Sequence, residues 1–342
     1  MCRIFGFVGN IKKEERPLVG RILRGLILAE ESKNPDGTGV VIKTMPKGYN
    51  VMVKKGVRGK AFLVRGYADF LYPGNFYMAL GHVRKKTTGK VSSRNAHPFG
   101  YKINERWYYG IHNGKIGNVE ELAREYGIKP AKVDSETFFR VLAKMLRDGA
   151  DVVEAIEELT YFISDKAEFA FAYMTPKEIF LWRNEGRPLA IFDFRSVGLG
   201  RFFASTRTMM EKALRLAIPK ASKKFKKVTS FEAVPYRLYR MSLDDNYEVV
   251  AVKDLKYREK PKHRVVETFW QRNRSYWRDD RYGVRDMTDE QIETEMFNLE
   301  IELDSDFSDP NEYYELEDYY QALHREKRRR ELLKQGNELL PF

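Results

Sequence analysis

The sequence has a single cysteine, Cys2, and only five histidines among its 342 residues. One cysteine excludes an intramolecular disulfide and fits a reducing compartment. The scattered histidines form no cluster with the spacing of a zinc site, and the glycines do not form the Gly-x-x-x-x-Gly-Lys-Ser/Thr loop that cradles phosphates. We therefore expect the chain to use neither a metal nor another cofactor.

Long hydrophobic runs are absent as well. No apolar stretch approaches the roughly 18–20 residues of a membrane-spanning helix, and the charged N-terminus has no signal-peptide core. We therefore expect a cytoplasmic protein that does not enter a membrane. With 43% hydrophobic residues, the chain can bury a core large enough for one big domain, and its length leaves room for an extension.

Cys2 lies directly behind the initiator methionine. Removal of Met1 would leave one residue with both a thiol and a free α-amine. Unperturbed pKa values are about 7.7–8.0 for an α-amine and about 8.5 for a thiol, so the amine can accept the thiol proton directly or through a water. Cys2 is thus a candidate nucleophile with its own base, and we expect His82 and His97 to be structural. The alternative is a small apolar residue at the start of a buried strand, the commoner fate of a free cysteine.

Four sequence blocks follow Cys2 in a fixed order. They are Gly81-His82-Val83-Arg84-Lys85-Lys86-Thr87-Thr88-Gly89, Asn95-Ala96-His97-Pro98-Phe99, His112-Asn113-Gly114 and Asp134-Ser135-Glu136. Together with Cys2 they resemble the class II glutamine amidotransferases, which release ammonia from glutamine with an N-terminal nucleophile. The resemblance spans roughly residues 2–255. It implies an α+β fold, the four-layer αββα sandwich of the Ntn hydrolases, with Cys2 at the end of a central strand.

Arg3 and Lys85 differ from the synthetase branches of that family, which usually carry glycine after the cysteine and an aromatic residue after the motif arginine. Both residues resemble the stand-alone branch that opens Met-Cys-Arg and includes γ-glutamyl amide hydrolases. The stretch Asn-Pro-Asp-Gly-Thr-Gly at 34–39 is similar to a segment after the first helix of that branch. The resemblance therefore implies a stand-alone enzyme without a fused synthetase.

Glutamine has an α-carboxylate, an α-ammonium and a planar amide, so its site needs a cation, an anion and donors for an oxyanion. Arg84 suits the carboxylate because a guanidinium binds both oxygens in a planar fork. Asp134 suits the ammonium, and the Asn113 amide with the Gly114 N–H suits the oxyanion. With the residues that the resemblance adds, the predicted set is Cys2, Asn113 and Gly114 for catalysis and Arg84, Thr87, His112 and Asp134 for substrate binding.

Each assignment has a structural alternative. Asn113-Gly114 is also a strong signal for a two-residue hairpin turn, and a turn and an oxyanion hole can coexist. Asp134 also suits the N-cap of the helix that follows it. Arg84 is one of 61 lysines and arginines, most of which must be solvated.

Short aromatic and β-branched runs predict many strands and few helices. The expected helices are 16–32, 134–147 and 152–164. The expected strands are 4–8, 39–43, 49–54, 76–83, 107–112, 169–174, 179–183, 189–194, 202–205 and 236–241. These runs are too apolar to face water, which indicates stacked sheets covered by helices.

The character of the chain changes near residue 257, so we expect a glutaminase domain, 1–257, and a charged, aromatic-rich extension, 258–342. Residues 253–285 are basic and aromatic, 286–320 contain no lysine or arginine, and 324–330 are basic again. Such blocks are typical of a solvated, partly disordered tail whose ends attract its middle, without the periodic apolar pattern of a core. The alternative is a docking arm for a partner enzyme or, less favoured, for nucleic acid, which the net charge of +12 would permit.

The sequence therefore predicts a glutamine amidotransferase-type amidohydrolase. Cys2 attacks the γ-amide of L-glutamine, a glutamyl thioester forms, and the ammonia passes to an acceptor on a separate partner enzyme. One alternative is the hydrolysis of another γ-glutamyl amide or peptide. A second alternative is a non-catalytic interaction scaffold with a polyanion-binding tail.

Overall fold

The computed structural model describes residues 2–29, 36–45, 48–85, 91–218, 225, 227–258, 284–303, 319–320, 322–324, 326–327 and 330. Thr87, one of the predicted substrate-binding residues, lies outside these ranges. The chain divides into two compact units, residues 1–261 and 262–342. Within the described residues, no helix is both long and apolar enough to span a bilayer.

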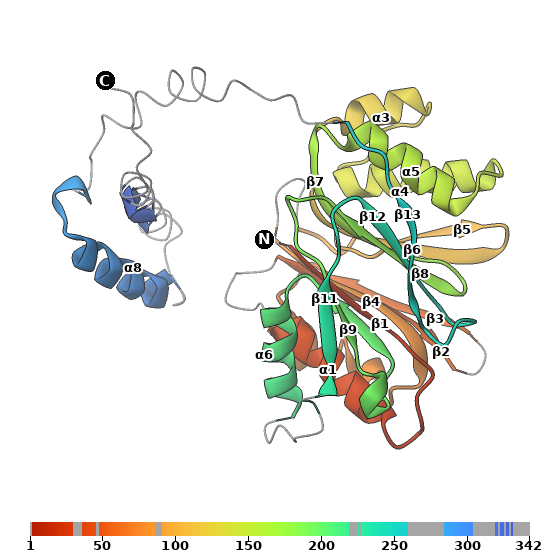
Figure 1. Cartoon of the computed structure of the whole chain (residues 1–342), viewed down its shortest axis with the longest axis horizontal. Coiled ribbons are helices and arrows are strands. Elements are labelled where there is room, and N and C mark those ends of the chain that lie inside the picture. The colour runs from red at the N-terminus through yellow and green to blue at the C-terminus, as the bar shows by residue number, and fades with distance from the viewer. Residues whose placement is uncertain are drawn as a thin grey trace. The chain divides into compact units, whose positions relative to one another are not determined.

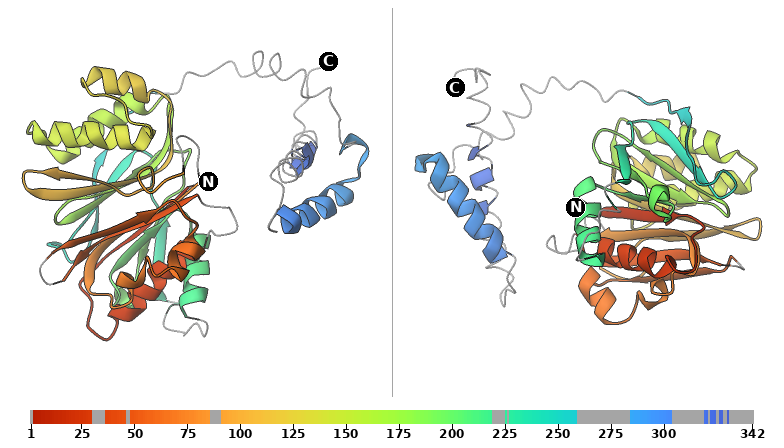
Figure 2. Two further views of the ribbon diagram at one scale, coloured as in Figure 1. Left: turned by 180° about the vertical axis from the view of Figure 1, so that it is seen from behind. Right: turned by 60° about the horizontal axis from the view of Figure 1, so that its bottom comes forward.

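Two sheets form the first unit, and helices cover the outer face of each (Figures 1 and 2). Neighbouring strands are antiparallel, in the orders β11-β9-β10-β1-β4-β2-β3 and β13-β12-β8-β7-β6-β5. The strands are β1 (Arg3–Val8), β2 (Gly37–Thr44), β3 (Asn50–Lys55), β4 (Phe76–Arg84), β5 (Phe99–Ile103), β6 (Arg106–Ile116), β7 (Ala167–Met174), β8 (Glu178–Arg183), β9 (Ala190–Asp193), β10 (Arg201–Ala204), β11 (Thr229–Glu232), β12 (Arg237–Ser242) and β13 (Val249–Asp254). The helices of this unit are α1 (Arg16–Leu28), α2 (Gly59–Val64), α3 (Val119–Glu125), α4 (Asp134–Arg147), α5 (Val152–Ile163) and α6 (Arg207–Ala217), with short 3₁₀ helices at Asp69–Leu71 and Arg195–Val197.

Three buried layers hold the helices and sheets together. Phe5 and Phe7 of β1 pack with residues of α1 and α6 on one face of the larger sheet. Ile4 and Val8 point to the other face, because side chains alternate along a strand, and they pack against the smaller sheet. A third core joins the smaller sheet to α4 and α5. The order helix, sheet, sheet, helix confirms the predicted αββα sandwich.

Helix α4 covers the predicted range, and α5 ends one residue earlier than expected. Helix α6 was not predicted, although it begins with a recognisable cap. Thr206 accepts a hydrogen bond from Met209 N at 3.1 Å, which satisfies one of the free N–H groups of the first turn. Gly25 of α1 lets this helix come close, since a Cβ on Gly25 would lie 2.6 Å from the carbonyl oxygen of Ala213.

The predicted hairpin turn at Asn113-Gly114 is wrong. Both residues lie inside β6, which continues to Ile116 because β7 supplies partners along that whole length. The hairpin turn lies at the other end of β6, where Asn104 and Glu105 connect β5 to β6. Their φ angles are +45° and +63°. Two successive positive φ values are typical of type I′ turns. The sequence signal was missed because a glutamate occupies the position that glycine usually takes.

The second unit contains α8 (Asp289–Leu303) and a 3₁₀ turn at Val284–Asp286. Ile292 and Leu299 of α8 are buried against Leu323, so the expectation of no periodic apolar pattern is wrong for this stretch. The expected attraction between charge blocks is present, because Arg330 pairs with Asp289 at 2.9 Å. The basic, aromatic segment that suggested a docking arm lies mostly outside the described residues.

Candidate active site

Three strand ends bring predicted residues together. Side chains at even positions of β1 and β4, and at odd positions of β6, belong to the core between the two sheets. The same alternation directs Cys2, Arg84 and Asn113 into the space between the sheets. Arg3 lies opposite Val83 in the ladder, so Cys2 is next to Arg84.

Cys2 is half-buried at the edge of this space. Its Sγ donates a hydrogen bond to the Lys85 carbonyl at 3.2 Å. Burial raises the pKa of the thiol and the Asp134 carboxylate acts in the same direction, whereas the bond to Lys85 and the charge of Arg84 act against them. The thiol is therefore protonated near neutral pH, and attack on an amide requires a base. Arg84 and Asp134 are both close enough to influence its ionisation.

Asn113 brings a buried donor to the site. Its side chain is 1% exposed, and no described residue accepts a hydrogen bond from its Nδ2. Burying an unsatisfied amide typically costs about 1–3 kcal/mol of stability. A donor that stays unpaired in the resting protein is available to a negatively charged oxygen.

The backbone N–H of Gly114 points toward the open edge of β6. Phe169, opposite Gly114 in β7, uses its own N–H and C=O with Asn184, each at 3.0 Å. Because both groups of one residue point to the same side in an antiparallel ladder, Gly114 directs its N–H away from β7. On that side β5 pairs with β6 only as far as Gly110. The edge beside Gly114 is thus free of a further strand within the described ranges.

Only glycine fits at position 114. Its φ is +152°, and a Cβ there would lie 1.8 Å from the carbonyl oxygen of Glu168 and 2.7 Å from His112 Nε2. Both atoms belong to the packed β6–β7 pair, so a side chain would push the two strands apart. The glycine therefore keeps the exposed N–H and the neighbouring Asn113 in register with β7.

Asp134 is the first residue of α4, while Val133 occupies the N-cap position and makes no side-chain cap bond. The Asp134 carboxylate instead reaches β6. Its Oδ2 accepts from Ile116 N at 2.8 Å, and its Oδ1 accepts from Ser135 N at 2.8 Å. The helix-cap alternative for Asp134 is therefore wrong. Its side chain instead connects the start of α4 to the end of β6, the strand that carries Asn113.

Arg84 is the last residue of β4 and is 3% exposed. It lies opposite Gly37 of β2, and its carbonyl accepts from Asp36 N at 2.5 Å. The Asp-Gly pair that the sequence singled out therefore lies beside Arg84. An arginine this buried is not the solvated charge of the alternative interpretation.

The imidazole rings of His82 and His97 pack 4.1 Å apart, and both are buried. His82 Nε2 lies 3.0 Å from the His112 carbonyl, which joins β4 of one sheet to β6 of the other. The His112 ring stacks on Phe171 at 4.3 Å, on the face of the smaller sheet that α4 covers. The structure thus places the His112 side chain apart from Cys2 and from the space between the sheets.

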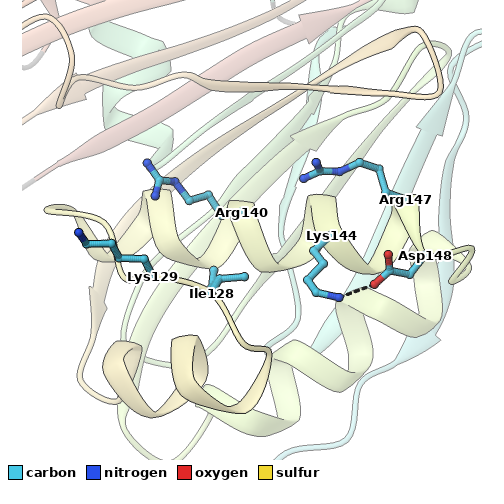
Figure 3. A pocket seen from close by; sticks show the side chains of 6 residues that line it. All are labelled: Ile128, Lys129, Arg140, Lys144, Arg147 and Asp148. Carbon is cyan, nitrogen blue, oxygen red and sulfur yellow. Dashed lines mark hydrogen bonds and ion pairs between the residues drawn. The ribbon is translucent and has the colours of Figure 1, made fainter.

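A hollow of about 380 Å³ lies on α4 and the segment before it. Figure 3 shows the side chains that line it, which are Ile128, Lys129, Arg140, Lys144, Arg147 and Asp148. None of the predicted site residues lines it. Two of its cations are paired on α4 itself, Arg140 with Glu136 and Lys144 with Asp148, each at 2.5 Å. The hollow is therefore a charged helix surface separate from the site around Cys2.

Part of the chain is similar in sequence to known proteins. Residues 71–191, which include Arg84, Asn113, Gly114 and Asp134, match the family model for class II glutamine amidotransferases. Glutamine–fructose-6-phosphate aminotransferase (isomerizing) of Aquifex aeolicus is 31% identical over 198 residues, 56% of this chain and 30% of that protein. Amidophosphoribosyltransferase of Methanocaldococcus jannaschii is 28% identical over 162 residues, 46% of this chain and 32% of that protein. The chain thus spans about a third of the length of the curated relatives it matches.

Solved structures show the same fold. Glutamine phosphoribosylpyrophosphate amidotransferase from B. subtilis, complexed with ADP and GMP, superposes with a TM-score of 0.52. The match is 19% identical and covers 71% of this chain and 48% of that chain. The sandwich and the order of the motifs agree with the match of residues 71–191 to the class II glutamine amidotransferases, so this part of the chain resembles a domain of that family.

Proposed function

We propose that this chain hydrolyses the side-chain amide of L-glutamine at Cys2 and releases ammonia. One observation carries the proposal: the strand end that faces the same inter-sheet space as Cys2 carries a buried side-chain donor with no acceptor among the described residues, followed by a backbone N–H that points away from β7. These donors are the buried Nδ2 of Asn113 and the outward-pointing N–H of Gly114. Removal of one oxyanion donor typically costs about 2.7–4 kcal/mol of transition-state stabilisation.

The charged neighbours of Cys2 suit the two ends of the amino acid. Arg84 would bind the α-carboxylate with its planar fork, and Asp134 would bind the α-ammonium. Thr87, which follows Arg84 in the same motif, would contact the substrate. His112 was predicted to do so too, but the position of its ring favours an indirect role, developed below.

The reaction uses groups of the chain itself. After removal of Met1, the α-amine of Cys2 accepts the thiol proton while Sγ attacks the amide carbon, and Asn113 and Gly114 stabilise the oxyanion. The amine then protonates the leaving nitrogen, ammonia departs, and a thioester remains. Water, deprotonated by the same amine, hydrolyses the thioester to glutamate and restores the thiol.

The acceptor of the ammonia would be bound by a separate partner enzyme. The names of the relatives describe transfer to a sugar phosphate or a phosphoribosyl group, which supports an acceptor for the ammonia. The glutaminase domain would comprise residues 1–257, with the extension from 258 available to the partner. A cytoplasmic location remains our prediction, because a free thiol nucleophile must stay reduced.

Mass spectrometry of the purified chain tests the nucleophile. We expect Met1 to be absent and a diazo-ketone analogue of glutamine to alkylate Cys2, with loss of ammonia release. Cys2→Ala should abolish ammonia release and keep the thermal unfolding temperature, and Cys2→Ser should retain a trace at most. Lys144→Ala, in the hollow on α4, is the matched control and should behave as wild type.

The outcomes separate the alternatives. Ammonia release at the wild-type rate by Cys2→Ala would remove the nucleophile assignment. Alkylation of Cys2 without turnover of glutamine, but with turnover of another γ-glutamyl amide, would establish the alternative that the enzyme hydrolyses a different γ-glutamyl substrate. A protein that retains Met1 and forms no adduct with the diazo-ketone would leave the non-catalytic interaction scaffold as the remaining alternative.

A further inference from the structure

A chain of buried polar groups lies behind the candidate site. His82 Nε2 lies 3.0 Å from the His112 carbonyl, His112 Nδ1 lies 2.8 Å from Ser135 Oγ, and Ser135 Oγ lies 3.3 Å from Asp134 Oδ1. His82 is 0% exposed, His112 1% and Ser135 2%. The chain joins β4, β6 and the start of α4, the three elements that carry Arg84, Asn113 and Asp134.

The direction of each hydrogen bond follows from what the end groups can do. A carbonyl only accepts, so His82 donates from Nε2 to His112. An ionised carboxylate also only accepts, so Ser135 donates its hydroxyl proton to Asp134, and it accepts from His112 in the tautomer that carries the proton on Nδ1. Burial lowers the pKa of His82 to about 3 and that of His112 to about 4, although Asp134 opposes the shift of His112. Both rings are therefore neutral at pH 7. Each ring then carries a single N–H proton, which agrees with one donated hydrogen bond from each histidine.

The Asp134 carboxylate has about four acceptor sites. Oδ1 accepts from both the N–H and the hydroxyl of Ser135, at 2.8 and 3.3 Å. Oδ2 accepts from Ile116 N at 2.8 Å. Three sites are thus filled by the protein, and the fourth, on Oδ2, is left for a ligand.

We propose that Ser135, held by His112, is a positioning residue that orients the open Oδ2 site of Asp134 toward the α-ammonium of the substrate. Ser135 would thereby determine how strongly the enzyme selects substrates that carry an α-amino group. The inference rests on the proposed function. Without the hydroxyl, Oδ1 loses one of its two donors, and only the N–H groups of Ser135 and Ile116 still fix the orientation of the carboxylate.

Thr137 provides a matched structural control in the same turn of α4. Its side chain is buried and its Oγ1 accepts from Ala131 N at 2.8 Å, with no bond to Asp134. Thr137→Ala should therefore lower stability without altering recognition of the α-amine. Ser135→Thr keeps a hydroxyl and should restore the behaviour of the wild type.

The test compares kcat and KM for glutamine and for glutarate monoamide, which has the same amide but no α-amine. For Ser135→Ala we expect KM for glutamine to rise about tenfold, as is typical for one lost hydrogen bond, with kcat and the values for glutarate monoamide nearly unchanged. Ser135→Thr should stay within about twofold of wild type. Full discrimination by Ser135→Ala, or equal loss of discrimination in Thr137→Ala, would overturn the inference.

Two further measurements keep the test decisive. If Ser135→Ala does not fold, Ser135→Cys, a weaker donor, should lose part of the discrimination, and unchanged discrimination would overturn the inference. Calorimetric binding of glutamine to Cys2→Ala, with and without Ser135→Ala, should show the same weakening without catalysis. Wild-type protein that neither binds nor hydrolyses glutamine would refute the proposed function itself, whereas an active Ser135→Ala with intact selectivity refutes only the positioning role.

Discussion

Two clusters of buried polar groups, one at each end of β1, differ in how completely they are paired. At the end that holds Cys2, Asn113 Nδ2, His112 Nε2 and both ring nitrogens of His97 are buried without partners among the described residues. At the other end of β1, Arg201 lies opposite Val8 and each of its three guanidinium nitrogens has a partner, so we call this cluster the saturated end. Each unpaired buried group costs about 1–3 kcal/mol. The difference fits the proposal that the cluster near Cys2 binds a ligand, whereas the cluster around Arg201 stabilises the fold.

The saturated end is a network of four charges. Arg201 pairs with Asp193 at 3.1 Å and with Glu248 at 2.9 Å, and its Nε donates to the Tyr247 carbonyl at 2.6 Å. Arg195 pairs with the same two carboxylates, including Asp193 at 2.9 Å. The Arg201 side chain is 6% exposed, so removing it would leave carboxylates without part of their compensation.

The largest effect should come from the unsatisfied end. Asn113→Ala removes the proposed oxyanion donor, so we expect kcat for glutamine to fall about 10²–10³-fold. Its free energy of unfolding should stay equal or rise, because the Nδ2 of the lost amide has no partner among the described residues. Ammonia release and urea unfolding check the two halves. An Asn113→Ala variant that is destabilised but fully active would show that Asn113 serves stability and not catalysis.

The saturated end should respond in the opposite sense. Arg201→Met breaks a buried ion pair, and we expect a loss of about 3 kcal/mol in the free energy of unfolding with kcat/KM for glutamine unchanged. Urea unfolding and ammonia release at pH 7 measure the two quantities. Lost activity in a variant that remains folded would show that this end also serves the reaction.

Acid should reduce the difference in stability between the wild type and Arg201→Met. Burial opposes ionisation of Asp193, but hydrogen bonds from Arg195 and the charge of Arg201 outweigh it, so the pKa of the carboxyl lies below its usual value. A carboxylate with a lowered pKa stabilises the fold above its unfolded pKa of about 3.9 and loses that contribution as pH falls through the folded value. The gap in urea midpoint between wild type and Arg201→Met should therefore be constant from pH 7 to 5 and shrink below about pH 4. A gap that widens in acid would contradict this sign.

The smallest effect should come from removing the second unit. A chain ending at residue 260 should hydrolyse glutamine within about twofold of the full rate, because every predicted site residue precedes it, and it should fail to co-purify with a partner. The cut must follow Arg258, whose N–H donates to Ser164 Oγ at 2.7 Å, and Tyr257, whose ring stacks on Tyr236 at 4.0 Å. A chain ending at 256 should lose stability. An inactive chain ending at 260 would show that the extension belongs to the catalytic unit.

The fold could be predicted from the sequence where the signal was local or shared with a family. The order of motifs predicted the sandwich, and the apolar spacing predicted α4 to the residue. The turn at Asn113 failed because the pairing of β6 with a distant β7 outweighed a local preference. The bond from Ser135 to His112 joins residues 23 positions apart and has no sequence pattern, so only the packed structure brought it out.

The place of β1 has a consequence for the order of events during synthesis. This strand is central in its sheet, and its partners are β4, at 76–84, and β10, at 201–204. At about 5–20 residues per second, the ribosome produces residue 204 roughly 10–40 s after Cys2. Until then the first strand lacks one of its neighbours and the N-terminus is open to an aminopeptidase. If Met1 is removed as proposed, its removal would therefore precede the burial of the thiol, and the proposed nucleophile would be formed on an incompletely folded chain and enclosed afterwards.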